Sequence, residues 1–187
     1  MDETIYEDQI FEDDLPEKGT FNQCKFINLD LKDADLSDYV FSECVFENCD
    51  LSLAKSNQTA FMNVRFLGCK LLGFNFEICK DFLFEVCFEN CILNLANFYK
   101  KRLKQSVFKH CTLKESDFTA ANLNKAVFED CDLSGAVFFQ TNLEDCDFRT
   151  AYHYSIDPEK NQVKKARFSA SGLSGLLDKY QLKIDPN

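Results

Sequence analysis

Large apolar residues recur at every fifth position through the middle of the chain, with mostly polar residues between them. Between residues 88 and 148 these positions alternate strictly between Phe and Leu: Phe88, Leu93, Phe98, Leu103, Phe108, Leu113, Phe118, Leu123, Phe128, Leu133, Phe138, Leu143 and Phe148. Neither an α-helix, with 3.6 residues per turn, nor an ordinary strand, with a period of two, produces a period of five. The pattern therefore indicates a structural repeat, which decides the fold class.

Small or thiol side chains precede most of these positions by two residues, as Cys91, Ala96 and Ser106 do. Residues two apart on an extended segment point to the same side. Each five-residue unit therefore predicts one short wall with a large and a small inward side chain, followed by a corner. Four such walls close a square coil of about twenty residues.

The same pattern begins earlier, with one exception and one interruption. From residue 21 the fifth positions are Phe21, Phe26, Leu31, Leu36, Phe41, Phe46, Leu51, Ser56, Phe61, Phe66, Leu71 and Phe76. Ser56 is the exception. The next run starts at Phe88, two residues late, which predicts a bulge within residues 77–87. If Leu83 takes the missing site, the twenty-residue columns continue across the break, and we expect one unbroken superhelix.

The repeat units resemble those of a known family. Motifs such as Ser116-Asp117-Phe118-Thr119-Ala120 and Ala121-Asn122-Leu123-Asn124-Lys125 are similar to those of pentapeptide-repeat proteins. The resemblance covers most of the chain. It implies an all-β solenoid, a right-handed quadrilateral parallel β-helix, which we place at residues 21–150.

Both ends of the chain depart from the repeat. Residues 1–20 keep its phase only at Tyr6 and Phe11, with Pro16 at the next site, and are expected to form an N-terminal cap or an irregular first coil. Residues 151–187 are expected to form a C-terminal capping and dimerisation module. Within it, four apolar residues at i, i+3, i+4 and i+7 predict an α-helical cap over about 171–181, with Ser171 as N-cap.

These four apolar residues are Leu173, Leu176, Leu177 and Tyr180. The tail resembles the C-terminal module of topoisomerase-protecting pentapeptide-repeat proteins, which covers the end of the superhelix and joins two chains tail to tail. The resemblance therefore implies a homodimer with these residues at the interface. A monomeric cap is the alternative.

Charge is unevenly distributed along the chain, whose formal net charge is −10. Residues 1–20 carry eight acids and one base, whereas residues 151–187 carry four acids and six bases. An acidic balance disfavours direct nucleic-acid binding, which depends on Lys and Arg at phosphates. Because the sequence has no run of about twenty apolar residues and begins without a signal-peptide pattern, we expect a cytoplasmic protein that does not enter a membrane.

Ten cysteines raise the question of disulfides or metal, and Cys44 with Cys49 and Cys87 with Cys91 have zinc-like spacing. However, nine of the ten fall in the small inward phase or its continuation, and only Cys87 does not. Neighbouring coils about 4.8 Å apart are close enough for a bridge in principle. Since a reducing cytosol opposes oxidation and free cysteine packs as a small hydrophobe, we interpret them as reduced core residues.

Asp81 and Lys101 fall in one column of small sites, one coil apart. One hypothesis is an interior or corner ion pair, because a lone buried charge is costly. The other is that the bulge extrudes Asp81 and that Lys101 reaches outward.

The two histidines, His110 and His153, are interpreted as solvated, and the chain has no phosphate-binding loop. We therefore expect no catalytic, cofactor or metal site and no enzymatic activity.

The resemblance also implies a function. The topoisomerase-protecting group includes quinolone-resistance and microcin-immunity factors, and it implies a DNA mimic that binds DNA gyrase or topoisomerase IV and protects it from quinolones or peptide toxins. The clearest acidic group comprises Asp30, Asp33, Asp35, Asp38 and Asp50. The alternative is a non-catalytic protein-binding scaffold with an unrelated partner, indicated by Met62, Leu67 and Leu72, which are outward by phase on one coil.

Overall fold

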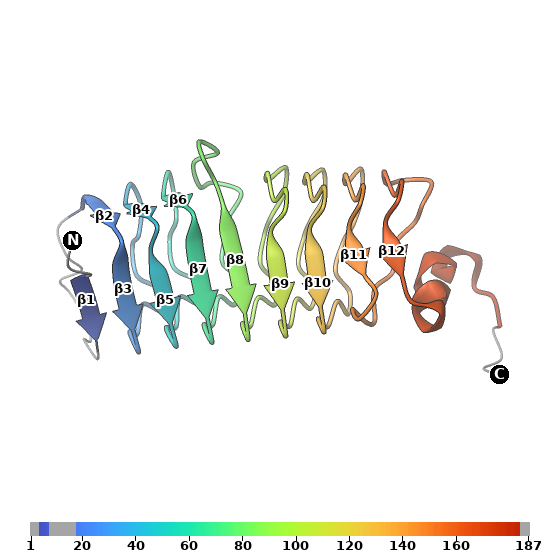
Figure 1. The fold of residues 1–187 in the computed structure, drawn as a ribbon, viewed down its shortest axis with the longest axis horizontal. Helices are drawn as coiled ribbons and strands as arrows, with labels where there is room; N and C mark the ends of the chain where they lie inside the picture. Colours follow the sequence, from blue (N-terminus) through green and yellow to red (C-terminus); the bar gives the residue numbers. More distant parts are fainter. Residues whose placement is uncertain (1–3, 8–17, 184–187) are drawn as a thin grey trace.

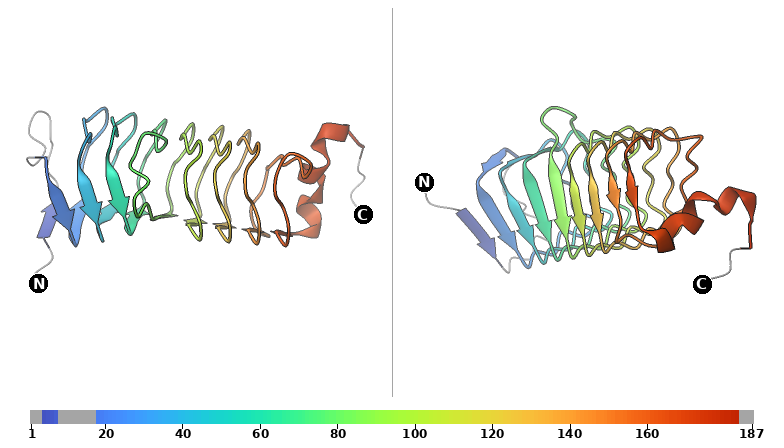
Figure 2. Two further views of the ribbon diagram at one scale, coloured as in Figure 1. Left: turned by 90° about the horizontal axis from the view of Figure 1, so that it is seen from above. Right: turned by 45° about the vertical axis from the view of Figure 1, so that its right-hand side comes forward.

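The computed structural model describes residues 4–7 and 18–183, which wind into a rod of stacked coils (Figure 1). One wall is a nine-stranded parallel sheet. In spatial order its strands are β1 (Thr4–Glu7), β3 (Cys24–Ile27), β5 (Val45–Glu47), β7 (Val64–Leu67), β8 (Val86–Glu89), β9 (Val107–Lys109), β10 (Val127–Glu129), β11 (Asp147–Phe148) and β12 (Arg167–Phe168). Figure 2 shows that these strands lie side by side along the length of the rod.

The other walls are less regular. A second parallel sheet, confined to the N-terminal coils, contains β2 (Thr20–Asn22), β4 (Val40–Ser42) and β6 (Ala60–Met62). Isolated parallel bridges, such as Asp50 with Lys70 and Asn97 with Asp117, hold the remaining walls together. The fold is a quadrilateral parallel β-solenoid, as the five-residue period predicts.

Successive coils are in register at twenty-residue steps. Phe26 pairs with Phe46, and Phe46 pairs with Phe66. The step from Phe66 to Phe88 is twenty-two residues, after which steps of twenty resume with Phe108. The predicted columns and the predicted continuity of the superhelix across the bulge are thus confirmed.

The parallel ladder extends beyond residues 21–150 in both directions. At the N-terminal end β1 pairs with β3, and the ring of Tyr6 stacks on Phe26 with centroids 5.1 Å apart. Phe11 and Pro16 lie outside the described residues. At the other end β12 pairs with β11, so that the final coil reaches Phe168.

Corners are formed by residues in the left-handed backbone region. Gln23, Asn28 and Asp33 occupy it at five-residue steps, with φ of 55°, 55° and 56°. This conformation costs roughly 1–2 kcal/mol for a residue with a Cβ atom. The corner N–H groups find partners in the next coil; that of Asn28, for example, donates to the carbonyl of Glu47 at 2.9 Å. Regular hydrogen bonds between coils therefore offset the local strain.

Phenylalanine rings fill the core in columns. Successive rings of Phe88, Phe108, Phe128 and Phe148 stack with centroids 5.2, 4.8 and 4.9 Å apart. Rings of a second column meet them edge to face; Phe118, for example, lies at 89° to Phe108. Both arrangements suit the quadrupole of an aromatic ring. The alternation of Phe and Leu along the chain thus becomes two interlocked aromatic columns.

Ser56, the exception in the repeat, lies inward and is hydrogen-bonded to the next coil. Its hydroxyl is buried and donates to the carbonyl of Asn75 at 2.6 Å. Phe74 occupies a small-residue site there, and its buried ring lies 4.6 Å from Phe76 and 6.1 Å from Phe61. The coil after Ser56 therefore carries a large side chain at a small site, packed against the rings of both neighbouring phenylalanines.

The predicted bulge is a projecting loop before β8 (Figure 1). The register is regular up to Lys80, whose N–H donates to Thr59, and has shifted by two residues where Val86 pairs with Val64. The prediction that Leu83 takes the inward site is wrong. Leu83 forms a corner with φ of 53° and is 64% exposed, so the next residue, Phe84, turns inward and is buried.

The C-terminal cap is helical, but its helices are of the 3₁₀ type rather than α-helical. They are η1 (Ala170–Leu176) and η2 (Asp178–Tyr180). The sequence Ser-Gly-Leu-Ser-Gly-Leu over 171–176 repeats every three residues, which matches the three residues per turn of a 3₁₀-helix. The N-cap is Ser169 rather than Ser171, since the Ser169 hydroxyl accepts the N–H of Gly172 at 3.2 Å.

The cysteines lie as predicted. All ten are free thiols, nine are buried, and only Cys87 is half-buried. Seven of the nine buried thiols also make a weak hydrogen bond to the neighbouring coil, as Cys69 does to the carbonyl of Phe46 at 3.3 Å. Their role in this structure is to fill the small inward sites.

Candidate partner-binding surfaces

The acidic group lies on the N-terminal coils. Four of its members, Asp30, Asp33, Asp35 and Asp38, are exposed, whereas Asp50 is half-buried. Asp33 and Asp38 are corner residues, and Asp30 and Asp35 each accept a backbone N–H two residues later, at 3.1 and 2.9 Å. The hydroxyl and N–H of Ser37 hold the pKa of Asp35 below its usual value. Fixed positions at turns therefore present these carboxylates to solvent.

Lysines from neighbouring coils face three of the five carboxylates. The pairs are Lys18 with Asp38 at 3.9 Å, Lys70 with Asp50 at 3.7 Å, and Lys55 beside Asp35 across a parallel bridge. Exposed pairs of this kind contribute little to stability. They do reduce the local negative potential, so the surface is less acidic than the five aspartates alone indicate. Each lysine lies twenty residues from its partner in the sequence. The twenty-residue repeat could therefore have predicted these pairs.

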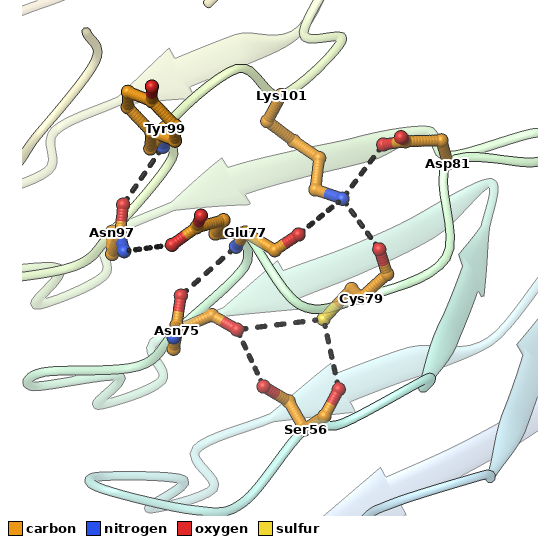
Figure 3. Close-up of polar contacts among 8 residues, drawn as sticks. All are labelled: Ser56, Asn75, Glu77, Cys79, Asp81, Asn97, Tyr99 and Lys101. Carbon is orange, nitrogen blue, oxygen red and sulfur yellow. Dashed lines mark hydrogen bonds and ion pairs between the residues drawn. The ribbon is translucent and has the colours of Figure 1, made fainter.

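Lys101 anchors the projecting loop from inside the solenoid (Figure 3). Its side chain is 1% exposed, and its ammonium donates to Asp81 Oδ1 at 2.9 Å and to the carbonyls of Cys79 and Glu77 at 2.7 and 3.3 Å. The side chain of Asp81 remains 68% exposed. The ion pair of the first hypothesis therefore forms, but its carboxylate lies at the surface, as in the second. The ammonium also lies 4.9 Å from the ring centre of Phe84.

The tip of this loop is apolar and exposed. Phe82 is 74% exposed and Leu83 64%, the largest exposed fractions among the large apolar residues that the structure describes. Three exposed basic residues, Lys100, Arg102 and Lys104, flank Lys101 in the next coil. The sequence analysis did not identify this apolar tip. The two extra residues of the bulge, next to consecutive apolar residues, could have indicated it.

The apolar residues that favour the scaffold alternative differ in exposure: Met62 and Leu67 are half-buried, and Leu72 is 39% exposed.

The C-terminal cap is attached to the last coil by close packing. Gly172 and Gly175 lie against Tyr154, where a Cβ atom on either glycine would collide with it. Lys179 in η2 pairs with Asp157 at 2.8 Å and Glu159 at 2.7 Å. These two hydrogen-bonded carboxylates raise the pKa of Lys179. The cap thus covers the end of the solenoid.

The predicted interface residues of the cap differ in exposure. Leu173, Leu177 and Tyr180 are exposed, by 47%, 36% and 54%. Leu176 instead packs against the core. The hydroxyl of Tyr180 donates to Glu159 at 3.2 Å, which fixes the ring at the surface. Three of the four side chains are therefore available to a partner.

None of the helices that the structure describes is long and apolar enough to span a membrane.

Comparisons with known proteins identify the repeat. One family model, described as a pentapeptide repeat region, matches residues 82–151 and 102–176, and another, described as pentapeptide repeats (8 copies), matches residues 20–55. Curated protein sequences give no match.

Solved structures with the same fold include two pentapeptide-solenoid proteins. HetL from the cyanobacterium Nostoc sp. strain PCC 7120, involved in heterocyst differentiation regulation, has a TM-score of 0.59 at 14% identity, over 90% of this chain and 77% of that one. A trypsin-treated variant of QnrB1, a plasmid-mediated fluoroquinolone resistance protein, has a TM-score of 0.51 at 19% identity, over 98% of both chains. At these identities the likeness shows the fold alone.

Proposed function

Because this chain belongs to the pentapeptide-repeat family, we propose that it is a homodimeric DNA mimic that binds DNA gyrase or topoisomerase IV and protects it from quinolones or peptide toxins. In this role the protein shares the cytoplasm with the topoisomerase and does not itself catalyse a reaction. The observation that carries the proposal is an unbroken rod with fixed outward carboxylates. The end-to-end likeness to QnrB1, whose name describes fluoroquinolone resistance, supports it.

The dimensions of the rod agree with this role. Nine strands about 4.8 Å apart make a ladder about 38 Å long, and a tail-to-tail dimer doubles that length. Walls of about three extended residues plus side chains give a width of about 20 Å, close to that of duplex DNA. The exposed aspartates of the N-terminal coils would then lie at the two outer ends of the dimer, where they would contact basic residues that normally bind phosphates.

The test compares two variants in a gyrase supercoiling assay, with and without a quinolone. The first replaces the four exposed aspartates, Asp30, Asp33, Asp35 and Asp38, by Asn, which retains both the turn hydrogen bonds and the tolerance for positive φ. The control replaces Glu115, Asp117, Glu144 and Asp145 by the corresponding amides, which removes the same charge from the other half of the rod. We expect the first variant to lose its effect on gyrase and the control to keep it.

One observation favours the alternative, a scaffold for an unrelated protein. The apolar tip of Phe82 and Leu83 is held out by the buried Lys101 and is flanked by basic residues, which suits a partner with an apolar pocket and an acidic rim. A Phe82→Ser/Leu83→Ser variant separates the two functions. If it abolishes binding in a pull-down while the four-aspartate variant still binds, the scaffold replaces the mimic.

The dimer has its own test, because Leu173 and Leu177 are exposed on the cap. Replacing both by Ser should convert a dimer to a monomer in light scattering at micromolar concentration. The matched control is Leu53→Ser/Leu95→Ser, which changes two leucines of 54% exposure at corners of the rod. A full-length protein that is already monomeric would rule the dimer out.

A further inference from the structure

His110 and Asp130 lie at the same corner of successive coils. Both have positive φ, 52° and 50°, and the N–H of His110 donates to the carbonyl of Glu129 at 2.8 Å. The parallel register of β9 and β10 pairs Lys109 with Glu129, which places the corners directly beside each other. The corner at Asp130 is further fixed because its N–H donates to the hydroxyl of Thr150 at 2.9 Å. One imidazole and two carboxylates therefore converge from a rigid framework.

We propose that His110, Glu129 and Asp130 bind a first-row divalent metal ion such as Zn²⁺. The His110 Nδ1 atom lies 3.5 Å from Asp130 Oδ2, and one donor atom from each residue lies within 4.8 Å of the others. Ligand atoms around a tetrahedral ion, at about 2.0–2.2 Å from it, lie about 3.4 Å from one another. The imidazole and the Asp130 carboxylate already have that spacing, and only Glu129 must move.

The chemistry of the three side chains selects the class of ion. Imidazole and carboxylates together suit Zn²⁺ and its first-row neighbours, whereas Mg²⁺ and Ca²⁺ prefer oxygen ligands alone. The side chains of His110, Glu129 and Asp130 are about half exposed. An ion can therefore reach them, and its remaining positions stay open to water.

A lysine competes with the ion for Glu129. Lys109 Nζ lies 3.6 Å from Glu129 and 3.9 Å from Glu89, so it bridges the two glutamates along the sheet. When Glu129 turns to the metal, Lys109 keeps Glu89 as its partner. Removal of the lysine charge should therefore tighten metal binding, an effect that a purely structural role of these residues would not produce.

The second histidine provides a control within the same chain. His153 Nδ1 lies 3.1 Å from Asp132 Oδ1, but that carboxylate also accepts the Ser134 hydroxyl and pairs with Lys114. Among the described residues, His110, Glu129 and Asp130 form the one group of three such side chains with converging donor atoms. The two imidazoles thus differ in whether a second carboxylate lies within reach of the same ion.

The experiment measures Zn²⁺ binding to the full-length protein by calorimetry and by NMR, in a Cys87→Ser background that removes the half-buried thiol. We expect Zn²⁺ to shift the imidazole signals of His110 and to leave those of His153 unchanged. His110→Asn should weaken binding at least tenfold, about what even outer-shell changes cost. Asn occupies the same corner at positions 28, 48 and 90, so this variant retains the fold.

Three more variants complete the test. Glu129→Gln should weaken Zn²⁺ binding, Lys109→Gln should tighten it, and His153→Asn should leave it unchanged. Equal shifts of both histidines, or unchanged binding in His110→Asn, would show that no site exists at this corner.

Discussion

Phe108 lies in the middle of the aromatic column, so its replacement by alanine tests the predicted core most severely. Its ring is fully buried and stacks between Phe88 and Phe128, at 5.2 and 4.8 Å. It also meets Phe98 and Phe118 edge to face, each at 6.0 Å. Removing a buried phenylalanine costs about 3–5 kcal/mol, and each aromatic pair adds about 0.5–1.5 kcal/mol beyond buried area. Because measured phenylalanine-to-alanine costs already include such pairs, the loss of four of them places Phe108→Ala at the upper end of the range, about 5 kcal/mol.

The matched control is Cys111→Ala, three residues along the same coil. Cys111 is also buried, but its loss removes one heavy atom and a weak hydrogen bond to the carbonyl of Lys109 at 3.2 Å. One buried group of that size contributes about 1 kcal/mol. Urea unfolding under reducing conditions, followed by circular dichroism and tyrosine fluorescence, measures both variants. Similar losses of unfolding free energy at the two sites would refute the assignment of large and small inward positions.

Three further predictions concern polar and packing contacts. Burial alone would raise the pKa of Asp132, but hydrogen bonds from Ser134 and His153, among others, lower it to about 2 from the usual 3.8. The stabilising effect of the ionised carboxylate is therefore present above pH 4 and is lost as the pH falls through 2. In urea unfolding, Asp132→Asn should lower the free energy of unfolding by about 1–2 kcal/mol at pH 7 and by almost nothing near pH 2. Gly175→Ala should detach the cap, since its Cβ atom would collide with the carbonyl of Tyr154, and hydrogen exchange would show lost protection in η1 and η2 but not in the coils. Asp81→Asn should cost about 1–2 kcal/mol because a buried ammonium keeps only carbonyl partners, whereas an unchanged unfolding free energy would mean that the pair is not formed in solution.

The five-residue period predicted the walls, the columns and the inward cysteines because each inward site has the same neighbours in every coil. It failed where one coil differs from the next. Leu83 was expected inward, but the loop places the corner there and buries Phe84 instead. Phe74 is a large buried residue at a small-residue site, which the repeat did not predict.

The surfaces were predictable in part. The exposed aspartates were placed correctly on the N-terminal coils, and their lysine neighbours follow from the twenty-residue columns. The 3₁₀ helices of the cap match the three-residue repeat over 171–176, whereas the packing of Gly172 and Gly175 against Tyr154 is a contact that the spacing of apolar residues does not contain. His110, Glu129 and Asp130 converge only because of their side-chain conformations, in addition to the register of the coils. The five-residue phase does not predict these conformations, so both histidines were interpreted as solvated residues.

Displacement of DNA from gyrase tests the proposed mimicry most directly. A fluorescent duplex bound to purified gyrase is titrated with the full-length protein at two salt concentrations. If the protein occupies the DNA groove through its carboxylates, it should displace the duplex, and less effectively at higher salt, since the Debye length is only about 8 Å at physiological ionic strength. A duplex that stays bound at saturating protein, at either salt concentration, would contradict DNA mimicry.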